Sequence, residues 1–407
     1  MVKTQKKFPN VGIIFLLYWV VLIIWQNINP NSVGGTADTL IKTILLLILV
    51  LYSIIYARAN WQPFVILLIF TMNMLISFSF DGVFSLRSLL NYFYPVVLFF
   101  LTFIVGGKHE LKKSQLVFFL NGVVVVVLYT VIYSVLFLRK EILAAITATN
   151  AYGSEFSAFF ISNHEYALYL MAGIISCILL LELNQSKRLM LKLYYSVCVS
   201  LFFLCLLITF SRTYLFVTLA IIFVYVVLHR KSKISKLIIG LAIVAGIIVL
   251  SVPSLKQYVF EIILKENTDS GRAALRTLAW NTYKEGSLAQ KLWGSGASNV
   301  QNYFDAQTSH HSVHNAYLQV LLYYGAIGIF FLLLLVAVHW MSVVRSMKHN
   351  PSLGAIFVAL PIGALLAMVV QTVTIFTSFL DSYFLTIFAF VIPKYVCNAI
   401  RASSFED

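Results

Sequence analysis

Arginine side chains beside long apolar segments are the first residues of this sequence that could do chemistry. Arg212 stands between two apolar runs with almost no loop between them. A guanidinium presents a planar fork that matches two phosphate oxygens, so Arg212 is a candidate for binding a phosphate that a lipid carries. The alternative is an interfacial anchor, whose charged end reaches the head groups while its stem stays in the apolar region.

A second set of candidates lies in a polar segment, 253–312, that interrupts the apolar runs. The sequence DSG at 269–271 is typical of a helix start, and apolar residues then recur at helical spacing. Arg272, Arg276 and Trp280, spaced i, i+4 and i+8, would share one face of that helix. The pattern predicts a phosphate clamp beside an aromatic ring on which a sugar could stack. The alternatives are a solvated basic face and, for the tryptophan, a residue of the membrane interface.

Histidine at the end of this segment is a candidate for proton transfer. His314 begins the next apolar run, where a substrate carried by a lipid would arrive, and a neutral imidazole can act as a general base on a hydroxyl. Asn315 would orient His314 or the substrate. His310 and His314 could bind a metal if helical, but no HExxH pattern or suitably spaced acidic partner accompanies them. We therefore expect no metal and no cofactor; a purely structural histidine remains the alternative.

Two local features of the second half of the chain complete the candidates. The sequence WGSG at 293–296 predicts a turn, with glycines that adopt positive φ or allow close backbone approach. It is not a nucleotide-binding loop, because no strand precedes it. Gln371, near the end of the apolar run 353–371, would either make a hydrogen bond between helices or line a substrate site.

The elements that must position these residues are membrane helices. Of the 407 residues, 60% are hydrophobic and only 11% are charged, whereas about a quarter of the residues of a soluble protein are charged. The apolar runs are long enough to span a bilayer as helices, and the alternating segments of a barrel are missing. We expect an all-α polytopic membrane protein with about 12 transmembrane helices. The predicted helices are 11–25, 39–57, 63–80, 93–106, 115–138, 164–182, 193–210, 213–229, 237–252, 313–340, 353–371 and 382–398.

The chain is expected to form a single membrane domain, 1–407, with the long loop 253–312 between the ninth and tenth helices. The run 11–25 has no small-residue cleavage site after it, so it is predicted to be retained as the first helix. The four cysteines lie in or near apolar runs and indicate no disulfide or metal framework.

The charge distribution predicts the orientation in the membrane. The net charge is +14, and the excess of Lys and Arg falls almost wholly in the segments on one side of the predicted helices. By the positive-inside rule, this side and both termini are cytoplasmic, and the loop 253–312 is extracytoplasmic. The basic excess thus marks topology and contact with anionic membrane lipids, and argues against a nucleic-acid partner.

The motifs together resemble one family. SRT at 211–213 opens a helix, SGR…W…LWGSG follows in the long loop, and HNAYLQVLLYYGAIG begins at His314. In order, spacing and placement they resemble the O-antigen ligase and Wzy-type polysaccharide polymerase superfamily. The segment FISNHEYALYL is similar to the family's Asn-x-x-Ala segment, with Asn163 as its asparagine. The resemblance is strong over 156–328, and the first half of the chain matches only in topology.

The resemblance implies a fold and an activity. It implies a GT-C-like helical bundle, metal-independent glycosyl transfer, and functional roles for Arg212, Arg272 and His314, with Asn163 and Gln371 at the substrate. Nucleotide sugars are cytoplasmic, so a transferase that faces outward needs a donor with its own activating group, such as a polyprenyl diphosphate-linked sugar. Arginines would stabilise the departing diphosphate, and the histidine would deprotonate the acceptor hydroxyl.

The expected reaction is polymerisation of undecaprenyl diphosphate-linked oligosaccharide repeat units at the outer face of the bacterial cytoplasmic membrane, by inverting transfer. The lipid-linked oligosaccharide is both donor and acceptor, and a chain-length regulator is a candidate partner. Two alternatives remain open. One is a ligase that transfers finished glycan to lipid A core or another acceptor. The other, from a different class, is a transporter of lipid-linked oligosaccharides, which would usually place polar groups at the bilayer midplane.

Overall fold

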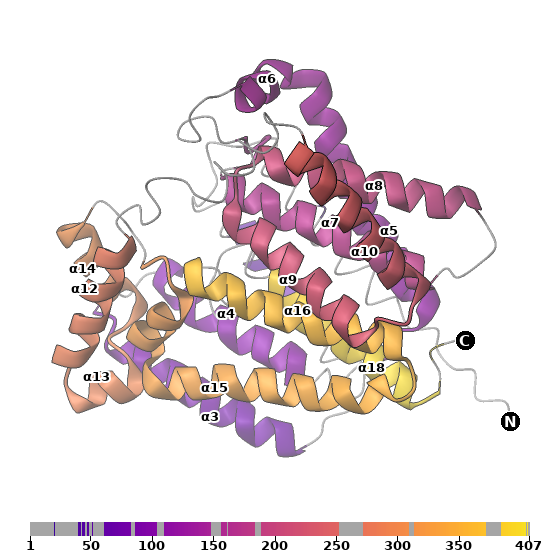
Figure 1. Ribbon diagram of the computed structural model, residues 1–407. Helices are drawn as coiled ribbons and strands as arrows, with labels where there is room; N and C mark the ends of the chain where they lie inside the picture. Colours follow the sequence, from indigo (N-terminus) through magenta and orange to yellow (C-terminus); the bar gives the residue numbers. More distant parts are fainter. Residues whose placement is uncertain are drawn as a thin grey trace, which may run out of the picture.

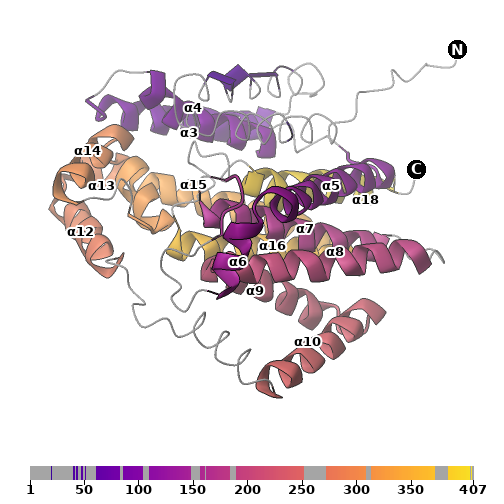
Figure 2. The ribbon, with the colours of Figure 1, turned by 90° about the horizontal axis from the view of Figure 1, so that it is seen from above.

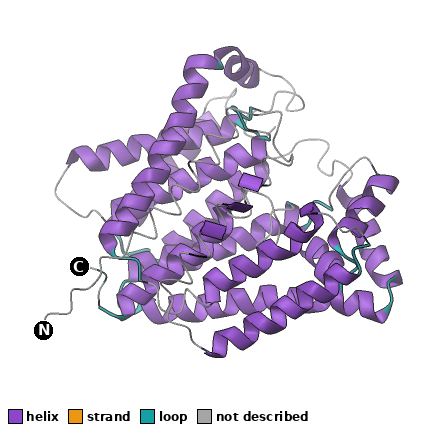
Figure 3. Ribbon diagram, turned by 180° about the vertical axis from the view of Figure 1, so that it is seen from behind, coloured by secondary structure: helices purple, strands orange, loops and turns teal. Residues whose placement is uncertain are grey.

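The computed structural model describes most of the chain after residue 60. The described residues are 61–82, 86–103, 110–147, 156–160, 162–183, 189–251, 272–308, 313–371, 384–403 and 405, together with single positions 20, 40, 41, 43, 44, 47, 48 and 51. Every regular element among them is a helix (Figure 3).

The helices keep one order along the chain, and Figure 1 shows their arrangement. The first seven are α3 (Trp61–Ser79), α4 (Leu86–Phe103), α5 (Lys113–Phe137), α6 (Arg139–Thr147), α7 (Asn163–Leu183), α8 (Leu189–Ile208) and α9 (Arg212–Leu228). The remainder are α10 (Lys233–Ser251), α12 (Arg272–Glu285), α13 (Leu288–Trp293), α14 (Ala297–Gln307), α15 (Ala316–Met347), α16 (Pro351–Val370), the π-helix η3 (Ile387–Val391) and α18 (Ile392–Arg401).

The apolar runs from 63–80 onward all coincide with helices of the structure. Within the described residues, six helices are long and apolar enough to cross a membrane, by length and composition. They are Lys113–Phe137, Asn163–Leu183, Leu189–Ile208, Ala316–Met347, Pro351–Val370 and Phe384–Arg401. The predicted helix 11–25 lies outside the described residues apart from position 20, and the described positions between 40 and 51 are helical. The all-helical class is confirmed, while the total of about 12 helices stays a prediction.

Helix ends differ from the prediction where polar residues extend a helix beyond its apolar run. α4 begins at Leu86 rather than at 93, and α15 continues to Met347 rather than ending at 340. In α15 the added turns carry Ser342 and Ser346, which are buried against α18. Hydropathy alone cannot find such turns, because their polar groups are satisfied by a neighbouring helix instead of by water.

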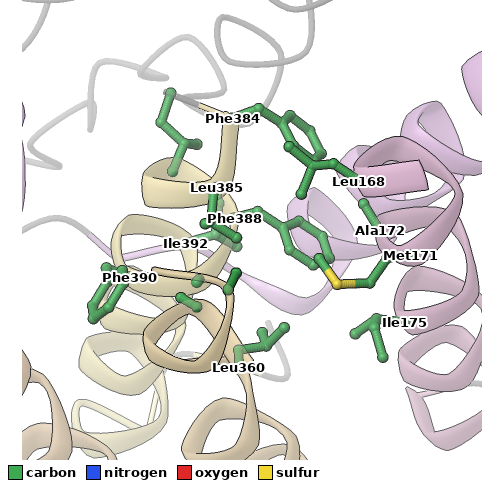
Figure 4. Packing of buried hydrophobic residues seen from close by; sticks show 14 of the residues in the cluster. Leu168, Met171, Ala172, Ile175, Leu360, Phe384, Leu385, Phe388, Phe390 and Ile392 are labelled. Carbon is green, nitrogen blue, oxygen red and sulfur yellow. The ribbon is translucent and has the colours of Figure 1, made fainter. Parts of the chain in front are cut away.

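One helix occupies the centre of the bundle. Nearly every side chain of α7 is buried, as expected for a helix that is apolar on all sides. Figure 4 shows Leu168, Met171 and Ala172 of this helix against Phe384 and Phe388 of the segment that leads into α18. Viewed from above, α3 and α4 form one flank of the molecule and α10 lies on the opposite flank (Figure 2).

The peripheral helices expose large apolar side chains. Examples are Leu68 on α3, Val125 on α5, Leu204 on α8 and Ile243 on α10, each more than half exposed. Apolar faces of this extent would associate in water. They are the expected outer surface of a bundle whose solvent is hydrocarbon.

The three helices of the long loop gather at one end of α15, called here the loop end (Figure 1). The predicted turn at 293–296 is confirmed. Gly294 has φ +89°, and a Cβ there would lie 2.2 Å from the carbonyl oxygen of Tyr323. Its counterpart is Gly325, where α15 kinks with φ +70° and where a Cβ would lie 2.2 Å from the carbonyl oxygen of Leu292. Two backbones therefore meet at a distance that only glycine permits.

A carboxylate at the end of α3 fixes the next loop helix. Asp81, 1% exposed, accepts a hydrogen bond from the Asn299 N–H at 3.2 Å and from the Ser298 hydroxyl at 2.9 Å. The Tyr92 hydroxyl accepts from the Ala297 N–H at 2.7 Å. These N–H groups belong to the first turn of α14 and have no partner within that helix. The described part of the loop is thus a docked helical layer.

Candidate active site

The last turn of α16 is the point at which the predicted site residues meet. Asn315 donates from Nδ2 to the Val369 carbonyl oxygen at 3.0 Å. Arg276 donates from Nη2 to the same oxygen at 3.4 Å, and Arg272 from Nη1 to the Val370 carbonyl oxygen at 3.4 Å. The last carbonyls of a helix have no partner within it and carry partial negative charge. Two cations and an amide therefore gather where helix α16 ends.

The same turn is tied to the start of α9. Gln371, 5% exposed, follows the last residue of α16, and its Nε2 donates to the Thr213 hydroxyl at 3.4 Å. Thr213 directly follows Arg212, the first residue of α9. The hydrogen bond between helices that the sequence suggested for Gln371 is confirmed, and it brings Arg212 to the turn that the loop arginines contact.

The short turn before Arg212 is held by the start of α7. Asn163 donates from Nδ2 to the Thr209 carbonyl oxygen at 2.9 Å. His164 Nδ1 and the Ser211 hydroxyl lie 2.8 Å apart. Phe210, with φ +52°, completes a turn of three residues between α8 and α9. Arg212 is thus placed by two residues of the Asn163 segment and not by apolar packing alone.

The entry to α15 positions His314. Asn315 is the N-cap of this helix, and its Oδ1 accepts from the Leu318 N–H at 3.0 Å while its Nδ2 reaches α16. His314 has φ +48°, a left-handed conformation in which histidine is several-fold enriched among non-glycine residues. Val313, on its other side, is buried. The imidazole is consequently attached to a backbone that is fixed on both sides, one residue from the last turn of α16.

One predicted residue lies apart from this cluster. Trp280 is 44% exposed, stacks on Tyr283 with ring centroids 5.7 Å apart, and has Lys284 Nζ 5.5 Å from its ring centroid. It shares α12 with Arg272 and Arg276 but makes its ring contacts within α12 itself. Its role at a sugar stays a prediction.

Sequence reasoning missed several groups at the site. The Val369 and Val370 carbonyls are backbone atoms of apolar residues, which have no sequence signature. His164 and Ser211 lie within the two motifs that contain Asn163 and Arg212, yet only their contact reveals a role. Glu165, 6% exposed in the first turn of α7, is a buried carboxylate that polarity at a helix start could have indicated. In the described part of the chain, no three His, Cys, Asp or Glu side chains gather in a metal-binding arrangement.

The sequence was compared with known families and proteins. Residues 197–333 match the family model Wzy_C, described as O-antigen ligase. No curated protein matches the chain. The matched region begins in α8 and ends within α15, so it includes Arg212, all three loop helices and His314, while Asn163 and Gln371 lie outside it. With its multiple apolar helices, the chain is an integral membrane protein, and residues 197–333 identify it as a member of the O-antigen ligase and polymerase superfamily.

Proposed function

We propose that this protein polymerises polyprenyl diphosphate-linked oligosaccharide repeat units, with the last turn of α16 at the centre of its active site. One observation carries the proposal: side chains of Arg272, Arg276 and Asn315 converge on that turn, and Gln371 joins it to the helix that Arg212 begins. Cations at a helix end beside apolar helices suit a diphosphate that is attached to a lipid.

The hydrogen bonds of the arginines support an exchange of partners. Both arginine–carbonyl distances are 3.4 Å, beyond the usual 2.7–3.2 Å range. The Arg276 Nε is buried and has no hydrogen-bond partner in the described part of the chain. A diphosphate oxygen would offer a charge-assisted bond that is roughly twice as strong as a neutral one. Arg272 and Arg276 would therefore turn from carbonyls to the donor when it binds.

The reaction requires one bond to form and one to break. A hydroxyl oxygen of the acceptor sugar attacks the anomeric carbon of the donor, and the bond from that carbon to the diphosphate oxygen breaks. The electron pair leaves with the diphosphate, whose growing charge the arginines stabilise. His314 accepts the hydroxyl proton. A single displacement of this kind inverts the anomeric centre.

Arg212 would bind the second phosphate. Its own N–H groups belong to the start of α9, where the helix dipole favours an anion. The turn that Asn163 and His164 hold fixes the direction in which α9 begins. In this arrangement Asn163 acts through Arg212, as a positioning residue. The side of the bundle that carries the site would be extracytoplasmic, as the charge distribution predicts.

A ligase is the second candidate, because the matched family model is described as O-antigen ligase. The donor chemistry would be the same and the acceptor would differ, being lipid A core or another finished acceptor. A transporter is the candidate of a different class. Against it, the carboxylates that are buried in the described chain, Asp81, Glu165 and Glu182, lie in the first or last turns of helices or directly beyond them, and not at mid-helix.

The test uses the purified full chain in liposomes with its lipid-linked repeat unit and no other acceptor. A polymerase would yield a ladder of products on a gel, and Arg272→Ala and His314→Ala would abolish it. The matched controls are Arg230→Ala and His349→Ala, which remove the same side chains outside the membrane-spanning helices, at the end of the bundle away from the loop.

Other outcomes assign the other functions. Turnover that starts only when a distinct acceptor is added identifies a ligase. Movement of the lipid between leaflets without turnover identifies a transporter and overturns the proposal. A ladder that survives in both Arg272→Ala and His314→Ala would leave the polymerase in place but remove this cluster from its active site.

A further inference from the structure

Two cationic side chains converge on a single hydroxyl at the end of α15 away from the loop helices, where α18 lies (Figure 1). Lys394 donates from Nζ to the Ser342 hydroxyl oxygen at 3.0 Å. Arg401 donates from Nη2 to the same oxygen at 2.9 Å. A neutral hydroxyl cannot compensate two positive charges that are held this close to each other.

The other oxygens around this pair are neutral as well. Arg401 Nε donates to the Cys397 carbonyl oxygen at 3.2 Å, and its Nη2 also donates to Asn398 Oδ1 at 2.6 Å. The charges that act on Lys394 are those of Arg401, Cys397 and Arg345, so within the described chain no carboxylate is among them. The site therefore concentrates positive charge without a counter-ion from the protein.

The carboxylate nearest along the chain to these contacts does not change this conclusion. Glu110 precedes Leu111, whose N–H donates to the Tyr395 carbonyl oxygen at 3.1 Å, so it reaches the same end of the bundle. Its side chain is exposed, and it is not among the groups that act on Lys394.

The cluster is built into the packing of two helices. Ser342 is 4% exposed and Ser346 is 1% exposed, and the Ser346 hydroxyl bonds to the Cys397 carbonyl oxygen at 3.3 Å. Lys394 is half-buried, whereas Arg401 is exposed at the mouth of the cluster. The π-helix η3 directly precedes α18. Such π-turns are rare and occur often at functional sites, and this one sets the rotation with which α18 meets α15.

We propose that Lys394, Arg401 and Ser342 form a binding site for a phosphate group, and that its occupant is the head group of an anionic phospholipid. An arginine fork, a lysine point charge and a hydroxyl donor together suit phosphate oxygens. The position at the ends of apolar helices favours a lipid over a soluble anion, because a head group lies at that depth. The site lies away from the loop end and does not depend on the proposed glycosyl transfer.

Binding would have a structural consequence. The phosphate would compensate the repulsion between the two cations, and would link α18 to the final turns of α15. Since Asn315 caps the other end of α15 beside the candidate active site, the lipid would stabilise the helix that carries His314 into the membrane.

The experiment measures lipid binding to the full chain purified in a neutral detergent. Native mass spectrometry would count bound lipids, and the unfolding temperature would be followed with phosphatidylglycerol, phosphatidylcholine or inorganic phosphate. We expect phosphatidylglycerol to bind and raise the unfolding temperature, and phosphatidylcholine to do neither. Lys394→Gln and Arg401→Gln should each weaken this binding by about tenfold or more, as the loss of a charged hydrogen bond implies.

The control is Lys236→Gln, which removes one exposed positive charge from α10 at the same end of the bundle. It should bind phosphatidylglycerol as the wild type does. Arg401 is exposed, so its replacement leaves the helix packing intact. Without lipid, Lys394→Gln should unfold at the wild-type temperature or above, because it removes a cation from a repulsive pair.

The possible results separate three cases. Stabilisation by inorganic phosphate alone, lost in both variants, would keep the phosphate site but assign it to a soluble anion. Equal binding of phosphatidylglycerol to wild type, Lys394→Gln and Arg401→Gln would overturn the site. Equal weakening in Lys236→Gln would also overturn it, by showing attraction to general charge.

Discussion

Two helix ends at the loop end obey the same electrostatic rule with different results. At the first turn of α14, the buried Asp81 carboxylate accepts from backbone N–H groups and from serine hydroxyls. At the last turn of α16, Arg272 and Arg276 face the carbonyls over 3.4 Å, and Arg276 keeps a buried N–H without an acceptor in the described chain. Each end has the charge that its dipole favours. The first is saturated and closed, and the second retains capacity for another anion.

The difference separates scaffold from site within one loop. α13 and α14 are locked to α3, α4 and α15 by short bonds and by glycine contacts that admit no side chain. α12 is joined to α16 by long bonds from half-exposed arginines. A loop of this kind can present α12 to a substrate while its other helices keep their place.

The largest effect is expected from opening the closed end. Asp81→Ala leaves the buried N–H groups of α14 without an acceptor and should lower the free energy of unfolding by about 3–5 kcal/mol, as the loss of a buried charged partner does. Thermal unfolding, with limited proteolysis of the loop, would measure it. Asp81→Asn, which keeps one acceptor oxygen, should lose less. Equal stability of the alanine variant and the wild type would end the distinction drawn between the two helix ends.

The open end should respond in activity rather than in stability. Arg272→Ala should lower turnover by about a hundredfold or more, as the loss of one charge-stabilising donor does, with a nearly unchanged unfolding temperature. Arg272→Lys keeps the charge but not the fork, and should recover part of the rate. A folded Arg272→Ala protein with near-normal turnover would remove this residue from the proposed chemistry.

The glycine contact offers a test with a matched control. Gly294→Ala forces a Cβ against the Tyr323 carbonyl at positive φ, and should cost about 1–3 kcal/mol of stability. Gly240→Ala, in α10 where a Cβ meets nothing within 4 Å, should be neutral or stabilising. Comparison of the two unfolding temperatures checks the contact. If both variants matched the wild type, the two backbones would not be in contact there.

The smallest effect is expected at Asn315, which serves both functions. Asn315→Ala removes the cap of α15 and should cost about 1 kcal/mol. Asn315→Asp keeps the cap but replaces the amide that donates to Val369 with a carboxylate. It should therefore preserve stability while lowering turnover, as an assay of both quantities would reveal. An aspartate variant with full activity would show that the amide contact with α16 serves only the fold.

The helical fold was predictable because its signal is local. Long apolar runs predicted the membrane helices, the spacing of Leu275 and Ala279 predicted α12, and the WGSG turn followed from its glycines. The polar helices α6, α13 and α14 were not predicted, since short polar helices owe their stability to contacts elsewhere in the chain. Asp81 and Ser298 are separated by 217 residues, and no local pattern announces such a pair.

The candidate site was predictable in its side chains but not in its centre. Arginine, histidine and asparagine at the ends of apolar runs were visible as groups that could bind a phosphate or move a proton. The acceptors that gather them are backbone carbonyls of Val369 and Val370, and their availability follows from where α16 ends. Trp280, predicted on the same face as the arginines, makes its ring contacts within α12 and not with that turn.

The pairing of α9 with α16 carries a consequence for how the sequence can change. The two helices are joined at both ends, by Gln371 with Thr213 and by Ser352 Oγ with His229 Nε2, which lie 3.1 Å apart. One residue inserted into either helix between these contacts would rotate the rest of that helix by about 100° and shift it by about 1.5 Å. Arg212 and the last turn of α16 would then separate. The lengths of the two helices can therefore change only together, and insertions should be tolerated outside this pair.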